Sequence, residues 1–129
     1  RGKNVMLVDD SIVRGTTSKE VVQLVKDAGA KKVYFVSAAP PVKFPDFYGI
    51  DIPTRKELIA ANKTIPQIKK FIGADILMYQ TIEGLTEAVT RKGEHNIDRL
   101  SMPYFDGWYV TGNITEKKMK ELEKLKGRV

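Results

Sequence analysis

One stretch near the start of the chain decides the fold, and it reads Val5-Met6-Leu7-Val8-Asp9-Asp10-Ser11-Ile12-Val13-Arg14-Gly15-Thr16-Thr17. Its apolar part, within residues 4–9, is typical of a parallel strand that is buried on both faces. A short loop with a glycine follows. Residues 20–28 then carry apolar side chains at spacings of three and four, which indicates a helix. The stretch therefore predicts a strand, a loop and a helix in succession.

Two further apolar runs extend this pattern. Residues 32–37 predict a second strand, so that strand, helix and strand form one βαβ unit with parallel pairing. Residues 75–80 predict a third strand. Helical spacing indicates four more helices, at residues 55–61, 65–72, 83–92 and 115–126. We therefore expect an α/β fold with a mostly parallel, Rossmann-like sheet flanked by helices, and a helical tail.

Composition narrows the functional class. The chain has 129 residues, 42% hydrophobic and 29% charged, which suffices for a packed core. No apolar run reaches the length of a membrane span, and no secretory leader follows Arg1, so we expect a cytoplasmic protein with no membrane partner. The formal net charge of +6 suits phosphorylated small molecules as well as nucleic acid. Because lysines alternate with glutamates in the tail, we expect a solvated helix face and no nucleic-acid partner.

The loop after the first predicted strand has the chemistry of a phosphate and sugar site. A helix N-terminus presents free N–H groups and a positive dipole end to a phosphate, and Gly15 allows close approach of the backbone. Additional hydroxyl donors are available from Ser11, Thr16 and Thr17. Asp9 and Asp10 would repel a phosphate, and they suit sugar hydroxyls or a Mg²⁺ ion. The loop thus fits a ribose 5-phosphate, although such paired carboxylates also serve as helix caps and turn residues in many α/β proteins.

The same run resembles the binding motif for phosphoribosyl pyrophosphate (PRPP) in type I phosphoribosyltransferases. Arg14 stands where most of that superfamily carries Thr, and this form is typical of the glutamine phosphoribosylpyrophosphate amidotransferase family. Successive later segments resemble the same family, namely Lys31–Tyr34, Ser37–Pro41, Tyr48–Thr54, Glu57–Ala60, Ile72–Asp75 and Asp106–Thr111. The resemblance covers nearly the full chain in order.

This resemblance implies a function. The family's enzyme forms 5-phosphoribosylamine from PRPP and glutamine-derived ammonia, in the first step of de novo purine biosynthesis. On the matching positions, Asp9 and Asp10 would be the catalytic residues, in contact with the ribose hydroxyls and with the Mg²⁺ cofactor. The substrate-binding residues would be Ser11, Ile12, Val13, Arg14, Gly15, Thr16 and Thr17. Purine nucleotides are expected as further ligands. The chain has no cysteine, so it resembles the branch of the family without an iron–sulfur cluster.

The resemblance also implies an extent. Residues 1–129 would form a single partial phosphoribosyltransferase domain, with the PRPP loop at 5–17 and a C-terminal extension at about 82–129. The glutaminase domain and the N-terminal half of the phosphoribosyltransferase domain would be missing. We therefore expect a fragment of a longer enzyme, inactive in isolation, whose full-length form is a homo-oligomer.

Several alternatives stay open at this point. The chain could be a non-catalytic, PRPP- or nucleotide-binding regulatory module of the same superfamily. Arg14 could bind phosphate, pyrophosphate or an inhibitor nucleotide, or it could form a structural ion pair. The aromatic residues within 104–109 could stack on a base or pack into the core. His95, the single histidine, is interpreted as part of an exposed loop.

Overall fold

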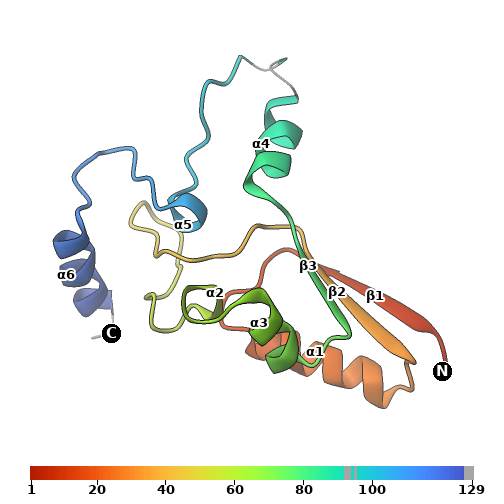
Figure 1. Cartoon of the computed structure of the whole chain (residues 1–129). Coiled ribbons are helices and arrows are strands. Elements are labelled where there is room, and N and C mark those ends of the chain that lie inside the picture. The colour runs from red at the N-terminus through yellow and green to blue at the C-terminus, as the bar shows by residue number, and fades with distance from the viewer. Residues whose placement is uncertain (92–93, 95, 127–129) are drawn as a thin grey trace.

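Three parallel strands form the centre of the structure, a computed structural model that describes residues 1–91, 94 and 96–126 (Figure 1). They are β1 (Asn4–Asp9), β2 (Lys32–Ser37) and β3 (Ile76–Tyr79), in the spatial order β1-β2-β3. Asp9 pairs with Ser37, and Ser37 pairs with Tyr79. The carboxyl ends of the strands therefore lie in line, and the predicted parallel α/β sheet is confirmed.

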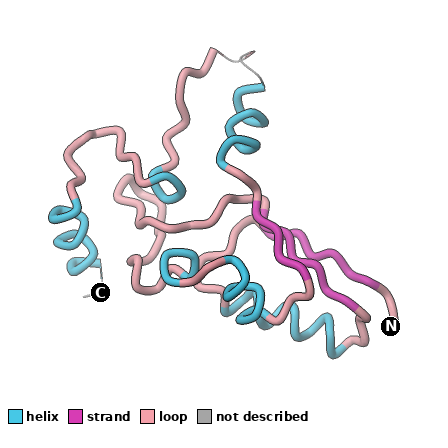
Figure 2. Tube along the Cα trace, in the orientation of Figure 1, coloured by secondary structure: helices cyan, strands magenta, loops and turns pink. Residues whose placement is uncertain are grey.

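Two helices cover one face of this sheet. They are α1 (Thr16–Asp27) and α3 (Ile65–Ile72), and both lie on the same side of the strands in Figure 1 and Figure 2. The core between helices and sheet consists of Ile12, Val22, Val33, Phe35, Ile59, Ile68, Ile72, Ala74 and Leu77. Since strand side chains alternate between faces, every second residue of β2 and β3 enters this core.

The opposite face of the sheet is open in the described part of the chain. We call it the open sheet face, and it is made of Met6, Val8, Tyr34, Val36, Ile76 and Met78. Val8 is 68% exposed and Met6 60%, and the two residues from β3 are about half exposed. The expectation that β1 is buried on both faces is therefore wrong for this chain. A parallel sheet with an uncovered apolar face is unusual, because such sheets are normally covered on both sides.

Some helix bounds differ from those predicted. Helix α1 begins at Thr16, four residues before the expected start, because Gly15, in a left-handed conformation, takes the N-cap position. Helix α2 is limited to Ile59–Asn62, since Leu58 is extended and fully buried in front of it. Helix α3 has the predicted bounds, and α4 runs over Ile82–Thr90. The predicted end of that helix at Lys92 and Gly93, and the interpretation of His95, fall outside the described residues.

The C-terminal part packs around the proline-rich segment 38–52. It contains α5 (Pro103–Asp106), which was not predicted, and α6 (Glu116–Lys126), which was. Tyr109 is 5% exposed, and its hydroxyl donates to the Pro45 carbonyl oxygen at 2.7 Å. Burial raises the pKa of the Tyr109 hydroxyl above its ordinary range. This member of the aromatic cluster therefore serves in core packing. Within the described ranges, every helix is too short or too polar to cross a bilayer.

The open sheet face predicts that this chain associates with copies of itself. We expect the unmodified chain to associate as its concentration rises, because an exposed apolar patch is removed from water by contact. Met6→Lys/Met78→Lys should keep the chain monomeric in sedimentation velocity, while its free energy of unfolding changes by about 0.5 kcal/mol or less. Leu24→Lys is the matched control, because Leu24 is 67% exposed on α1 and lies outside the face. A monomeric unmodified chain at every concentration would contradict this expectation.

Candidate functional site

Two neighbouring carboxylates stand at the carboxyl edge of the sheet. Asp9 is the last residue of β1, and Asp10 follows it; both are exposed. Their backbone is fixed, because the N–H groups of Ala38 and Ala39 donate to the carbonyl oxygens of Asp9 and Asp10, each at 2.9 Å. One Asp9 oxygen accepts the Asp10 N–H at 3.0 Å, and one Asp10 oxygen accepts the Ser11 hydroxyl at 2.9 Å. Each carboxylate keeps a second oxygen for a ligand.

The loop reaches the first turn of α1 through a backbone that only glycine adopts easily. Gly15 has φ of 81° and is buried. A Cβ atom at this position would stand 2.8 Å from the Ile59 Cδ1 atom and 3.2 Å from the Phe71 Cε1 atom. Ile12, earlier in the loop, is 1% exposed and belongs to the core. The loop is thus tied to the helix layer at two points.

The first turn of α1 has the features of an anion site. Gly15 provides no side-chain cap, and the turn carries no acidic residue. The first N–H groups of the helix therefore lack a partner within it, and the positive end of the helix dipole is not compensated. The side chains of Thr16 and Thr17 are exposed beside these groups.

These groups share one cavity of about 310 Å³. It is lined by Asp9, Asp10, Ser11, Val13, Arg14, Gly15, Thr16, Thr17 and Ser18. Of the nine predicted site residues, only Ile12 does not line it, because its side chain fills the core. Ser18 was missed, and its hydroxyl in the first helical turn was the available signal. A larger cavity, about 420 Å³, lies between Pro41 and α3 and has no carboxylate in its lining.

Arg14 forms a structural ion pair, which was one of the two roles considered for it beside the binding of an anion. Its Nε and Nη2 atoms donate to one oxygen of Glu57, at 3.2 and 3.0 Å. The other oxygen of Glu57 accepts the Thr54 hydroxyl at 3.2 Å. The Arg14 hydrogen bond, helped by the one from Thr54, lowers the pKa of Glu57 below its ordinary value. Arg14 also lines the cavity, so the pair stands at the edge of the site.

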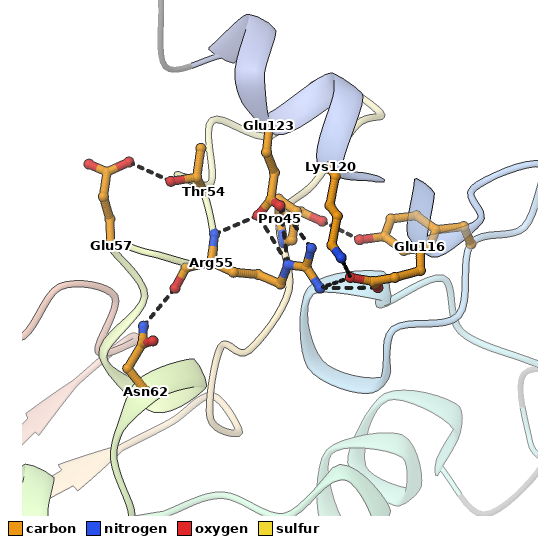
Figure 3. A network of polar contacts seen from close by, with 9 residues as sticks. Pro45, Thr54, Arg55, Glu57, Asn62, Glu116, Lys120 and Glu123 are labelled. Atoms are coloured by element: carbon orange, nitrogen blue, oxygen red, sulfur yellow. Dashed lines mark hydrogen bonds and ion pairs between the residues drawn. The ribbon is translucent and has the colours of Figure 1, made fainter. Parts of the chain in front are cut away.

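The segment that carries Glu57 is itself anchored to the C-terminal helix. Figure 3 shows the Arg55 guanidinium between two glutamates of α6. Its Nη2 atom lies 2.9 Å from Glu123, its Nη1 atom lies 2.9 Å from Glu116, and its backbone N–H donates to Glu123 at 2.7 Å. The Glu123 hydrogen bond raises the pKa of Arg55 above its ordinary range. On the other side of the segment, the Ile59 N–H donates to the Val13 carbonyl at 3.0 Å.

Comparison with known proteins gives a consistent set of relatives, although no family model matches. The chain is 53% identical, over 95% of its length, to an amidophosphoribosyltransferase of Pseudomonas aeruginosa, and 45% identical over 98% to that of Escherichia coli. Among solved structures, the B. subtilis glutamine PRPP amidotransferase, complexed with ADP and GMP, aligns over 84% of the chain with a TM-score of 0.75 and 42% identity. A structure of the allosteric regulatory enzyme of purine biosynthesis aligns over 95%, with a TM-score of 0.78 and 38% identity.

The parallel sheet, with its loop and helix N-terminus at the carboxyl edge, defines part of a type I phosphoribosyltransferase fold. The chain belongs to the amidophosphoribosyltransferase family. It spans about a quarter of the length of the curated relatives that it matches, 24% for the P. aeruginosa protein and 25% for the E. coli protein. The family expected from the sequence is thereby confirmed.

The geometry at Gly15 yields a stability prediction. Gly15→Ala should lower the free energy of unfolding by about 2 kcal/mol or more, because the variant combines an unfavourable φ with a contact against Ile59. Gly112→Ala is the matched control: Gly112 has φ of 68° and nothing within 4 Å of an added Cβ. Urea denaturation of both variants measures the difference. Equal losses would show that the contact with Ile59 has no cost.

A pH-dependent prediction follows from the Arg55 anchor. Burial alone would raise the pKa of Glu123, but hydrogen bonds from Arg55 outweigh it and hold that pKa below its ordinary value. Because the folded-state pKa is lowered, the stabilisation is complete above the ordinary pKa and is lost as the pH falls through the folded-state value. Glu123→Gln should cost about 1–3 kcal/mol at pH 7.

This cost should shrink in acid, which urea denaturation at a series of pH values would reveal. Glu121→Gln is the control, because Glu121 forms an exposed ion pair with Lys118 on the same helix. A cost for Glu123→Gln that stays constant down to low pH would contradict the assignment to the charged form of Glu123.

Proposed function

We propose that the loop cavity binds the phosphoribosyl group of PRPP, and that the chain is the PRPP-binding portion of an amidophosphoribosyltransferase. One observation carries the proposal: two exposed carboxylates and the uncapped N-terminus of α1 line the same cavity of about 310 Å³. An anionic group and a diol or metal therefore have complementary partners within one site. The names of the relatives support an enzyme over a non-catalytic regulatory module.

The 5-phosphate is assigned to the helix end of the cavity. Backbone N–H groups of the first turn of α1 would donate to the phosphate oxygens, and the helix dipole favours the negative charge. The exposed hydroxyls of Thr16 and Thr17 supply further donors. Since Gly15 has no side chain, the phosphate can approach the backbone closely.

The ribose hydroxyls and Mg²⁺ are assigned to Asp9 and Asp10. Mg²⁺ is usually held by one or two carboxylates, with waters and substrate oxygens as the other ligands. Two exposed carboxylates fit that donor set, and the described residues contain no cluster of three metal-binding side chains that would suggest a closed protein site. When bound, the ion would supply positive charge to the leaving pyrophosphate.

The proposed reaction is displacement at the anomeric carbon. The bond from this carbon to pyrophosphate breaks, a bond to the nitrogen of ammonia forms, and ammonia loses a proton. Positive charge develops on the ribose ring in such a transition state, and the carboxylates of Asp9 and Asp10 would stabilise it. Positioning and electrostatics would supply most of the rate enhancement.

We propose that the complete reaction takes place in the full-length enzyme, since this chain spans about a quarter of the length of its relatives. For the chain itself we propose binding of PRPP and of purine nucleotides, which carry the same phosphorylated ribose. The structure of the B. subtilis relative with ADP and GMP supports the nucleotide part. The cytoplasmic location, the homo-oligomeric state of the full-length protein and the inactivity of the isolated segment stay predictions.

Calorimetric titration of ribose 5-phosphate with Mg²⁺ tests the proposal. The unmodified chain should bind the sugar phosphate, and Asp9→Asn/Asp10→Asn should weaken binding by roughly a factor of ten or more, because ligands to the hydroxyls and to the metal are lost. Asp51→Asn/Asp98→Asn is the control with the same charge change, in two exposed residues outside the cavity. Equal affinity in all three proteins would refute the role of Asp9 and Asp10.

A further inference from the structure

Glu57 lies outside the loop cavity, yet it holds the only basic residue that lines it in the described part of the chain. We propose that Glu57 is a positioning residue, which fixes the Arg14 guanidinium so that it can bind a phosphate oxygen of the ligand. This inference rests on the proposed function and adds to it a side chain that lies 43 residues further along the sequence than Arg14.

The hydrogen-bond geometry leaves Arg14 able to bind a ligand. A guanidinium has five N–H donors in a rigid plane. Glu57 accepts from Nε and from Nη2 through a single oxygen, so the pair uses one edge of the guanidinium. The three other N–H donors remain for an anion. Because the plane is rigid, fixing one edge also fixes the direction of the others.

Glu57 is itself held firmly enough to serve this purpose. Its second oxygen accepts the Thr54 hydroxyl, and its backbone N–H donates to the Thr54 carbonyl at 2.9 Å. The next residue, Leu58, is fully buried. On the other side, the Arg55 anchor ties this turn to α6, as Figure 3 shows. The carboxylate therefore stands on a turn fixed from both ends.

Electrostatics give a reason for this arrangement. Arg14 shares its cavity with Asp9 and Asp10, and a free guanidinium would be attracted to either carboxylate. Such a pair would occupy the groups that are assigned to ribose and Mg²⁺. By holding Arg14 through a third carboxylate, Glu57 keeps the cation at the cavity and leaves both aspartates available.

A double-mutant cycle tests the inference. The affinity for ribose 5-phosphate with Mg²⁺ is measured by calorimetry for the unmodified chain, Glu57→Ala, Arg14→Ala and the double variant. We expect Glu57→Ala to weaken binding roughly tenfold, the scale found for residues that orient a ligand-binding group. In the Arg14→Ala background the same change should have no effect, because Glu57 acts through Arg14. Glu57→Gln keeps an acceptor and should restore part of the affinity.

Glu121→Ala is the matched control, since it removes a similarly exposed ion pair, with Lys118, outside the cavity. Equal weakening in both backgrounds would overturn the inference, because Glu57 would then act on the fold alone. No change, or tighter binding, in Glu57→Ala would also overturn it. If Glu57→Ala does not fold, the comparison of Glu57→Gln in the two backgrounds decides in the same way. Absence of binding by the unmodified chain would overturn the proposed function and this inference together, whereas binding insensitive to Glu57 overturns the inference alone.

Discussion

The left-handed backbone at Gly15 is the constraint on which the site depends. It turns the chain from the loop into the first turn of α1 while Ile59 and Phe71 close over the position that a side chain would take. The direction of this turn determines the positions of the helix N-terminus, of the neighbouring hydroxyl groups and of the Arg14 side chain. The same close contact locks the loop against the segment that carries Glu57, so the two are held in a fixed relative position.

Much of this arrangement could be predicted from residues 4–37, because local signals there agree with the tertiary structure. Apolar runs specified β1 and β2, and the loop chemistry specified the cavity except for Ser18. The failures have a common cause. Leu58 is drawn into a second small core with Val42 and Ile52, which shortens α2, and such a long-range contact leaves no mark in a local pattern. An ion pair of Arg14 was one of the alternatives, but its partner Glu57 could not be predicted, for the same reason.

The open sheet face shows a different limit of sequence reasoning. The apolar pattern of β1 specifies burial on both sides, yet only one side has a helix layer in the described chain. Pattern and structure disagree because a local apolar pattern indicates that a strand is buried but does not specify which element covers each of its faces. Met6 and Val8 therefore stay exposed, although the apolar run of β1 is typical of a strand covered on both sides.

The charges at the site determine which kinds of ligand can bind there. The formal net charge of +6 is not concentrated at the cavity, where Asp9 and Asp10 face one arginine that is already paired with Glu57. A simple anion would meet repulsion from the aspartates and attraction from the helix N-terminus. A ligand that places its phosphate at the helix and its hydroxyls or a metal at the aspartates turns both ends into attraction. Under the proposed function, these charges favour a phosphorylated sugar with Mg²⁺ over a bare anion, because without the ion the two carboxylates would repel the ligand.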